Sequence, residues 1–392
     1  MLLERKSVFK ELTNKSLLTV YFASFLIFMQ LLISLTLYPL YIKYRGGSDF
    51  MIGLQSSIFT LFSVVFRLYF GPMADTLGRR SPLLIGSFVF GTAPILVWLS
   101  QDFFWMSLAR IYQAIGMATF LSAASSTVAD MVSVKIRGAA IGLYRSVASL
   151  SVLIGPAIGL WLINSYGYSY FFIFVSGISI IAMFLLSIVS LPEKGKDEDR
   201  IKVKLKDLIS LLRDINLRAS YTGIILTSIA SGIILSYTAV YFLTLENIIP
   251  TSLFFLIYAL SGIISSTFSG YLSDKIGRMK VVIPSMLLFS GGIILLGIPG
   301  LLGRWTLIIS AILFGMGYPS CISVLTSWVV DSAPDRLRAS ALSFQESSID
   351  MGNTIGILFF GILASGFYYR PLFIGLGFIT FTYPLILKMV RR

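Results

Sequence analysis

The chain has 392 residues, of which 56% are hydrophobic and only 12% are charged, and its formal net charge is +13. Soluble domains carry roughly a quarter charged residues, so this composition excludes a soluble fold, and at about 30 residues for a span and its turn there is room for about a dozen membrane spans. With no histidine and a single cysteine, we expect no metal site, no cofactor and no disulfide bond.

Twelve apolar stretches follow one another, each long enough to cross a membrane as a helix. The first is longer than the core of a signal peptide, so we expect it to be retained as a span. The predicted spans are 17–43, 51–72, 82–100, 103–128, 138–163, 169–191, 217–243, 251–272, 281–299, 305–329, 339–364 and 369–389. A charged, amphipathic stretch over 193–216 predicts a cytoplasmic linker between an N-terminal bundle, 1–192, and a C-terminal bundle, 217–392.

The distribution of Lys and Arg predicts the topology, because cytoplasmic loops carry an excess of both. With the N-terminus inside, cytoplasmic segments hold 24 of the 31 basic residues, outer segments hold four, and three lie within spans. We therefore expect a multi-pass protein of the plasma membrane with both termini in the cytoplasm. This bias, together with attraction to anionic lipid, explains the positive charge, so no nucleic-acid partner is expected.

An internal repeat with an offset near 200 residues relates the two halves of the chain. Four positions at cytoplasmic helix ends recur: Asp75 with Asp274 and Gly78 with Gly277, at an offset of 199, and Asp130 with Asp331 and Arg137 with Arg338, at an offset of 201. The repeat predicts an all-α integral membrane protein with twelve transmembrane helices in two six-helix bundles, related by a pseudo-twofold axis.

The loops after the second and eighth spans share the pattern Gly-x-x-x-Asp-x-x-Gly-Arg, at 71–79 and 270–278. Both loops resemble the signature of the major facilitator superfamily, most closely its drug/proton antiporter group with twelve helices. The resemblance implies a latch between helices rather than a catalytic site. The implied partners are the start of the eleventh span for Asp75, Asp130 for Arg79, the fifth span for Asp274, and Asp331 for Arg278.

The fourth span reads Arg110-x-x-Gln113-x-x-Gly116, which resembles the superfamily motif R-x-x-Q-G-x-G-x-A with Ala114 in place of its first glycine. A buried arginine at membrane depth is costly, so function is the expected reason for it. Its repeat counterpart is Ala311, so the fold does not require a charge there. We expect Arg110 to serve proton coupling or anion binding.

The fifth span resembles the superfamily's antiporter motif through Gly142, Gly155, Pro156 and Gly159, while Ser151 and Leu160 replace two of its glycines. Glycines flatten a helix face and proline loosens its backbone, which suits a helix that flexes or slides between bundles. The resemblance favours export by antiport.

Two acids lie well within a span, Glu346 and Asp350, and with Asn353 they follow a spacing of i, i+4, i+7 that forms one polar stripe. Asp350 lies about 17 Å from the helix start, near the middle of a hydrocarbon layer of about 30 Å. An acid shielded from water holds its proton, and exposure or a nearby cation releases it. We predict Asp350 as the proton carrier, with Glu346 beside it.

Arg67 lies at a depth similar to that of Glu346, about 12 Å and 10 Å from the cytoplasmic ends of their spans. In the superfamily these two spans face each other, which implies a gating pair between Arg67 and Glu346. Arg145 is the competing partner, because it occupies the repeat position of Glu346.

Polar or aromatic residues at cavity depth are the candidate substrate contacts: Gln30, Tyr38, Gln113, Tyr237 and Asn353. Together these features predict a monomeric secondary active transporter, not an enzyme, that moves a small organic molecule through the lipid bilayer by alternating access, with protons as the coupling ion and export as the direction. The alternatives are a proton symporter or uniporter that imports a sugar or an organic anion and, from another class, a membrane receptor that does not transport.

Overall fold

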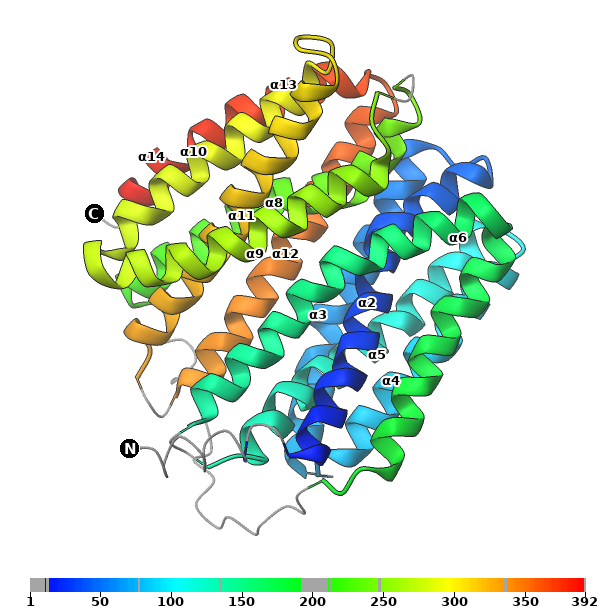
Figure 1. Ribbon diagram of the computed structural model, residues 1–392, viewed down its shortest axis with the longest axis vertical. Helices are drawn as coiled ribbons and strands as arrows, with labels where there is room; N and C mark the ends of the chain where they lie inside the picture. The colour runs from blue at the N-terminus through cyan, green and yellow to red at the C-terminus, as the bar shows by residue number, and fades with distance from the viewer. Residues whose placement is uncertain are drawn as a thin grey trace. The chain divides into compact units, whose positions relative to one another are not determined.

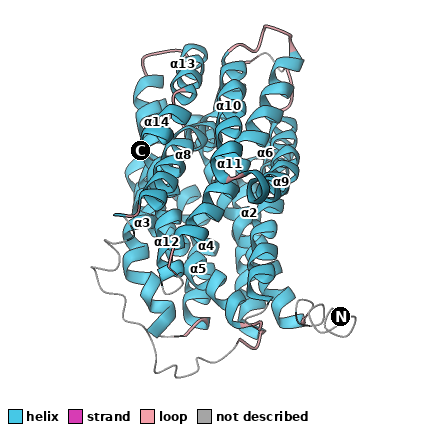
Figure 2. Ribbon diagram, turned by 90° about the vertical axis from the view of Figure 1, so that its left-hand side faces the viewer, coloured by secondary structure: helices cyan, strands magenta, loops and turns pink. Residues whose placement is uncertain are grey.

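The computed structural model describes residues 11, 14–76, 78–133, 136–191, 211, 213–245, 248–334 and 337–390, and within these ranges every labelled element is an α-helix (Figure 2). In chain order (Figure 1) the helices are α2 (Lys15–Tyr44), α3 (Asp49–Thr76), α4 (Arg80–Leu99), α5 (Phe103–Asp130), α6 (Arg137–Ile188), α8 (Ile215–Phe242), α9 (Thr251–Ile276), α10 (Arg278–Gly297), α11 (Arg304–Ser332), α12 (Arg338–Ala364), α13 (Tyr369–Phe381) and α14 (Tyr383–Val390).

Helix α6 contains two of the predicted spans. Its backbone leaves the helical conformation at Gly167, where φ is 82° and ψ is −179°, a region that is essentially open only to glycine. Figure 1 shows the chain reversing direction between the two arms of α6. Helices α13 and α14 together form the last predicted span. The described helices therefore correspond to the twelve predicted spans, and their ends differ from the prediction by a few residues.

Ten stretches of the described chain are helical, long and apolar enough to cross a membrane. Helix α5 is not among them, because Arg110, Gln113 and several Ser and Thr residues lower its mean hydropathy. Large apolar side chains also face outward, with Phe184 of α6 62% exposed and Ile264 of α9 71% exposed. Such surfaces are stable in contact with lipid tails and unfavourable in water. The structure is that of an all-α, multi-pass membrane protein.

A helix is the natural form of these segments because it satisfies every backbone polar group internally, where lipid offers no hydrogen bonds. The free N–H groups at two helix starts are capped by aspartates. Asp102 accepts from the N–H groups of Phe104 and Trp105 at 2.9 and 3.0 Å, and Asp214 caps α8 in the same way.

The chain forms two compact units. Unit 1 comprises Met1–Tyr38 and Ile58–Asp197, and unit 2 comprises Pro39–Ser57 and Glu198–Arg392. The boundary after 197 falls beside the predicted linker, most of which lies outside the described residues. Residues 39–57, the end of α2 and the start of α3 with their turn, pack with unit 2. We call this segment the 39–57 hairpin. The predicted division into bundles of residues 1–192 and 217–392 stays a prediction.

The same internal contacts recur in the two units, as an internal repeat requires. The hydroxyl of Tyr21 donates to the carbonyl of Ala140 at 3.0 Å in unit 1, and the hydroxyl of Tyr221 donates to that of Ala341 at 3.2 Å in unit 2. Helix α4 packs against α5 and α6, as α10 packs against α11 and α13. The two halves that repeat in sequence thus also make the same contacts between helices.

Glycines allow the closest of these contacts. On Gly317 of α11, a Cβ atom would lie 2.5 Å from the backbone nitrogen of Phe289 on α10, closer than real Cβ contacts come. Its repeat counterpart is Gly116 of α5, where a Cβ would lie 3.0 Å from a side-chain carbon of Val89 on α4. These glycines let the backbones of neighbouring helices touch, as small residues do in membrane helix packing.

We predict that Gly317→Ala destabilises the fold by about 1–3 kcal/mol. The added methyl group would clash with the backbone of α10 at Phe289, and backbone, unlike a side chain, cannot move away by changing its rotamer. Gly291→Ala is the matched control, since a Cβ there would meet only a side-chain carbon of Leu313, at 3.8 Å. Thermal unfolding in detergent should show a lower midpoint for Gly317→Ala alone. Equal midpoints for the two variants would contradict the close contact.

Candidate functional site

Two ion pairs at corresponding positions bind the loop signatures to the ends of α5 and α11. Arg79 Nε lies 2.8 Å from Asp130 Oδ2, and Arg278 Nη2 lies 2.6 Å from Asp331 Oδ2. Before each arginine stands a glycine with positive φ, 83° at Gly78 and 98° at Gly277. Only glycine adopts such turns readily, so the two loops hold their arginines in the same way.

Asp274 forms a third contact in the second of these loops. Its carboxylate lies 2.5 Å from Arg278 Nη1, and the hydroxyl of Ser273 accepts from the same guanidinium nitrogen at 2.5 Å. In unit 2 Asp274 therefore orients Arg278 toward Asp331. The predicted contact of Asp274 with the fifth span, which belongs to unit 1, stays a prediction. The latch role of these residues stays a prediction.

The side chains of Asp75, Arg145 and Arg338 lie outside the described residues, so their predicted roles stay predictions. Arg67 is 8% exposed in unit 1, whereas Glu346 belongs to unit 2. The gating pair between Arg67 and Glu346 also stays a prediction.

In unit 1, Arg110 is buried among aromatic rings. Its guanidinium carbon lies 4.4 Å from the ring centre of Phe59 and 5.3 Å from that of Tyr38, and its Nη1 donates to Gln113 Oε1 at 2.5 Å. Cation–π attraction to ring faces stabilises a positive charge where water is absent. Three of the residues singled out in the sequence, on α2 and α5, thus meet at one place.

Three buried side chains on the same two helices, two of them in contact with this arginine, carry polar atoms without partners. Within the described part of unit 1, both amide atoms of Gln30, the hydroxyl of Tyr38 and Nε2 of Gln113 are buried and have no hydrogen-bond partner. The three side chains are 0%, 1% and 0% exposed. Buried polar groups in folded proteins are nearly always paired, so these atoms need an explanation.

In unit 2, the predicted acids lie in a polar cluster between three helices. Asp350 of α12 is 3% exposed, and Glu346 lies one turn before it. The phenol of Tyr318 on α11 interacts electrostatically with both carboxylates and approaches the hydroxyls of Ser228 and Ser231 on α8. The structure adds Tyr318 to the residues that bear on the acids.

The other two candidate substrate contacts in unit 2 pack against protein. Asn353 abuts α8, where a Cβ on Gly232 would lie 2.9 Å from Asn353 Oδ1. The hydroxyl of Tyr237 donates to the carbonyls of Asp49 at 3.0 Å and Ile357 at 3.3 Å. Tyr237 therefore acts as a bond between helices.

The 39–57 hairpin is held to unit 2 by a set of contacts centred on Asp49. Tyr369 donates its hydroxyl hydrogen to Asp49 Oδ1 at 2.7 Å, and Lys43 Nζ lies 3.1 Å from the same oxygen. Two turns along α3, the hydroxyl of Ser57 donates to the carbonyl of Thr354 on α12 at 3.1 Å. The bond of Tyr369 to the Asp49 carboxylate is charge-assisted and therefore strong, and it ties the hairpin to α13. The neutral bond of Ser57 adds a link to α12.

Glycines complete this contact. A Cβ on Gly53 would lie 3.1 Å from the Cα of Gly361, and one on Gly361 would lie 2.9 Å from the carbonyl oxygen of Asp49. Helices α3 and α12 therefore touch backbone to backbone within unit 2. The sequence analysis missed Asp49, because it stands at a helix start rather than inside a span. Its hydrogen-bond partner, Tyr369, lies 320 positions later, and no local sequence pattern predicts such a contact.

The glycine face of the antiporter-like motif packs inside unit 1. A Cβ on Gly155 would lie 3.2 Å from Met29 of α2 and 3.4 Å from Ile33, and Ser151 donates to the carbonyl of Phe25 at 3.0 Å. Pro156 is buried beside Gly155. These residues therefore form the contact of α6 with α2, and their predicted role in gating is not tested by this contact.

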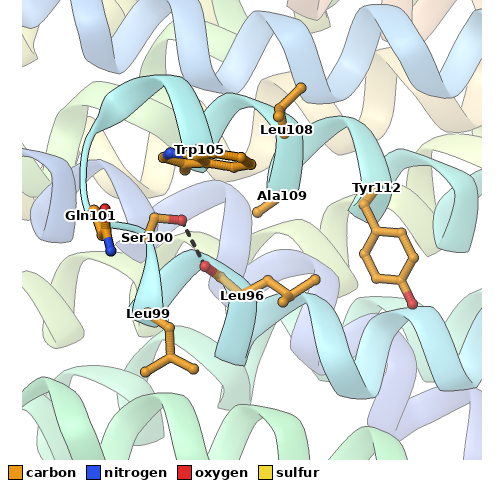
Figure 3. A pocket seen from close by; sticks show the side chains of 8 residues that line it. All are labelled: Leu96, Leu99, Ser100, Gln101, Trp105, Leu108, Ala109 and Tyr112. Carbon is orange, nitrogen blue, oxygen red and sulfur yellow. Dashed lines mark hydrogen bonds between the residues drawn. The ribbon is translucent and has the colours of Figure 1, made fainter.

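A pocket of about 500 Å³ lies between the end of α4 and the start of α5 (Figure 3). It is lined by Leu96, Leu99, Ser100, Gln101, Trp105, Leu108, Ala109 and Tyr112. Leu99 is 63% exposed and Trp105 54% exposed, so the pocket opens on the surface of unit 1. The lining includes none of the residues singled out in the sequence, and its apolar character suits a lipid chain.

Among the described residues, no three His, Cys, Asp or Glu side chains gather to hold a metal ion.

A helical membrane protein with buried charges inside its spans and duplicated ion pairs at their ends has the features of a transporter rather than an enzyme. The family model of the Major Facilitator Superfamily matches residues 20–249 and 247–392. The chain therefore belongs to the Major Facilitator Superfamily and is a membrane transporter.

Named relatives extend over most of the chain. The quinolone resistance protein NorA of Staphylococcus aureus is 23% identical over 370 residues, which cover 93% of this chain and 94% of that protein. An uncharacterised MFS-type transporter of Methanocaldococcus jannaschii is 25% identical over 333 residues, covering 83% and 85%. Among solved structures, the nucleoside transporter NupG matches with a TM-score of 0.75 at 15% identity, covering 96% of this chain and 99% of that one, which shows the shared fold.

We predict that Tyr369→Phe lowers the stability of the protein by about 1–3 kcal/mol, because Asp49 loses a charge-assisted hydrogen bond in a site that is mostly shielded from water. Tyr368→Phe is the control, since that neighbouring side chain is 87% exposed. Thermal unfolding should separate the two variants. The same midpoint for both would show that the bond to Asp49 contributes nothing.

A double-mutant cycle on Arg278→Ala and Asp331→Ala should give a coupling energy below about 1 kcal/mol, because Asp331 is half exposed and solvent screens the pair. The coupling should shrink when the salt concentration is raised. Unfolding at low and high salt measures both effects, with Lys280→Ala as the control for lost charge. Coupling that is independent of salt would argue against an electrostatic contact.

Proposed function

We propose that this transporter exports a small organic molecule across the plasma membrane in exchange for protons, with both termini in the cytoplasm. The observation that carries the proposal is the buried carboxylate of Asp350 in the middle of α12, 3% exposed and next to a second acid. An ionisable group at membrane depth is costly, and coupling to an ion is the best reason for it.

The surroundings of Asp350 suit a proton site. A carboxylate at this depth, next to a second acid, can be shielded from water in one conformation and exposed to it in another. The phenol of Tyr318 and the hydroxyls of Ser228 and Ser231 offer hydrogen-bond partners to a carboxylate near them. A helix face of this kind can bind a proton in one conformation and release it in another.

Contacts at the ends of the helices support alternating access between a conformation closed on the cytoplasmic side and one open to it. The ion pairs Arg79–Asp130 and Arg278–Asp331, with Asp274, would stabilise the closed conformation, aided by Arg67, Glu346 and Arg145 as the gate. The bond of Asp49 to Tyr369, formed within unit 2 in the same structure, would hold the 39–57 hairpin in place while the gate opens and closes. Proton binding at Asp350 then shifts the balance between the two conformations, since it favours one of them.

Export is supported by two features. The glycines of α6 resemble the antiporter motif, and a relative that covers nearly the whole chain is named for quinolone resistance, which removal of the drug from the cell would produce. A symporter or uniporter that imports sugars or organic anions is the alternative. The direction of flux driven by a pH gradient in proteoliposomes distinguishes export from import.

We predict that Asp350→Asn abolishes solute flux driven by a pH gradient but retains exchange of solute across liposomes without a gradient, because asparagine keeps the shape and loses the titrating group. Asp102→Asn is the matched control: asparagine caps a helix as well as aspartate does. Retained exchange shows that the variant is folded. Full flux driven by the pH gradient in Asp350→Asn would refute the role of Asp350 as the proton carrier.

A further inference from the structure

Three of the unpartnered polar side chains of unit 1 lie on the two helices that meet at Arg110. Gln30 and Tyr38 are two helical turns apart on the same face of α2, and Gln113 lies one turn from Arg110 on α5. Consecutive spans alternate in direction, so α2 and α5, the first and fourth spans, run in opposite directions. The direction from Tyr38 to Gln30 along α2 is therefore the same as the direction from Arg110 to Gln113 along α5.

Most of the free polar groups here, all except the amide oxygen of Gln30, can donate a hydrogen bond. Since Gln113 Oε1 accepts from Arg110, the free end of that amide is its NH₂ group, a donor. The hydroxyl of Tyr38 and the NH₂ group of Gln30 are further donors, and the guanidinium of Arg110 supplies a positive charge. A ligand that satisfies this set has to present acceptor oxygens and a negative charge, as a carboxylate does.

Aromatic rings give the rest of the site its character. Besides Phe59 and Tyr38 at Arg110, the ring of Phe172 lies 5.4 Å from that of Tyr38 and the ring of Phe171 lies 6.3 Å from it. Eight residues of helix separate Gln30 from Tyr38, about 12 Å. This length suits a flat body of two or three fused rings, with its carboxylate at the Arg110 end.

The second unit serves as an internal control. At the positions that correspond to Arg110 and Gln113, with an offset of 201, unit 2 has Ala311 and Phe314, which are 0% and 1% exposed. The fold thus packs these positions with apolar residues when no ligand has to be bound. An unpaired buried amide destabilises a folded protein, so the polar residues of unit 1 are retained at a cost in stability.

We propose that Gln30, Tyr38, Arg110 and Gln113 form the part of the substrate site that binds the carboxylate and ring system of an aromatic organic anion. The proposal rests on the proposed function, because it names the substrate class of the exporter. The carboxylate pairs with Arg110 and accepts from Gln113 and Tyr38, while the amide of Gln30 receives a polar group at the far end of the ligand.

The test compares three probes of nearly the same shape on the purified full chain: 2-naphthoate, its neutral amide 2-naphthamide, and the cation 2-naphthylmethylamine. Isothermal titration should give the tightest binding for naphthoate, by about tenfold or more over the amide, as expected for hydrogen bonds to a charged group. Equal or tighter binding of the cation would overturn the assignment.

Variants locate the site. Gln113→Leu and Gln30→Leu should each weaken naphthoate binding, Gln113→Leu by about tenfold, while their unfolding midpoints without ligand stay equal to wild type or rise. Arg110→Gln should remove the preference for naphthoate over naphthamide. Gln345→Leu is the control: Gln345 is an equally buried amide without partners in the described part of unit 2. Unchanged binding in Gln113→Leu, or equal loss in Gln345→Leu, would overturn the location.

The binding test and the transport test can refute the substrate class and the export function independently. If naphthoate does not bind, but another solute shows flux that depends on a pH gradient and on Asp350, the substrate class is wrong and the exporter stands. If naphthoate binds as described but is not moved in response to a pH gradient, the site stands and proton-coupled export is wrong.

Discussion

Polar groups inside a membrane span lack water, and the whole structure depends on how each of them finds a partner. Most hydroxyls in the spans bond to a carbonyl one turn earlier, as those of Ser87, Thr127 and Ser290 do. The buried groups that depart from this pattern gather mainly on α2 and α5 in unit 1 and on α8 and α12 in unit 2. The candidate sites therefore lie where buried polar groups have no hydrogen bond within their own helix.

The two units share a scaffold and differ in the charges they bury. Unit 1 has a buried arginine on α5 where unit 2 has Ala311, and unit 2 has Asp350 on α12 in a span whose repeat partner carries no acid. Under the proposed function, this asymmetry separates two tasks: one unit binds the anionic solute and the other binds the proton. Duplication supplied the packing, and divergence at a few buried positions supplied the chemistry.

The sequence predicted the spans, the repeat and the all-α membrane fold, because a continuous apolar stretch and the fixed rise of a helix leave few alternatives. The resemblance of its two loops to the superfamily signature also implied the pairing of Arg79 with Asp130 and of Arg278 with Asp331, which the structure has. Contacts that depend on tertiary packing could not be predicted. The partner of Asp49 lies at Tyr369, and Tyr318, in an apolar stretch of α11, looks like any other core aromatic until α8 and α12 are placed against it.

The packing of the 39–57 hairpin with unit 2 has a consequence for biosynthesis. Residues near the beginning of the chain pack with α12 and α13, the parts translated last, so the first two helices enter the bilayer long before the partners of Asp49 and Gly53 exist. During synthesis the nascent chain must keep this segment available without its final neighbours. Completion of the fold therefore coincides with the emergence of the last span from the ribosome, and a chain truncated before α13 cannot form the bond between Asp49 and Tyr369.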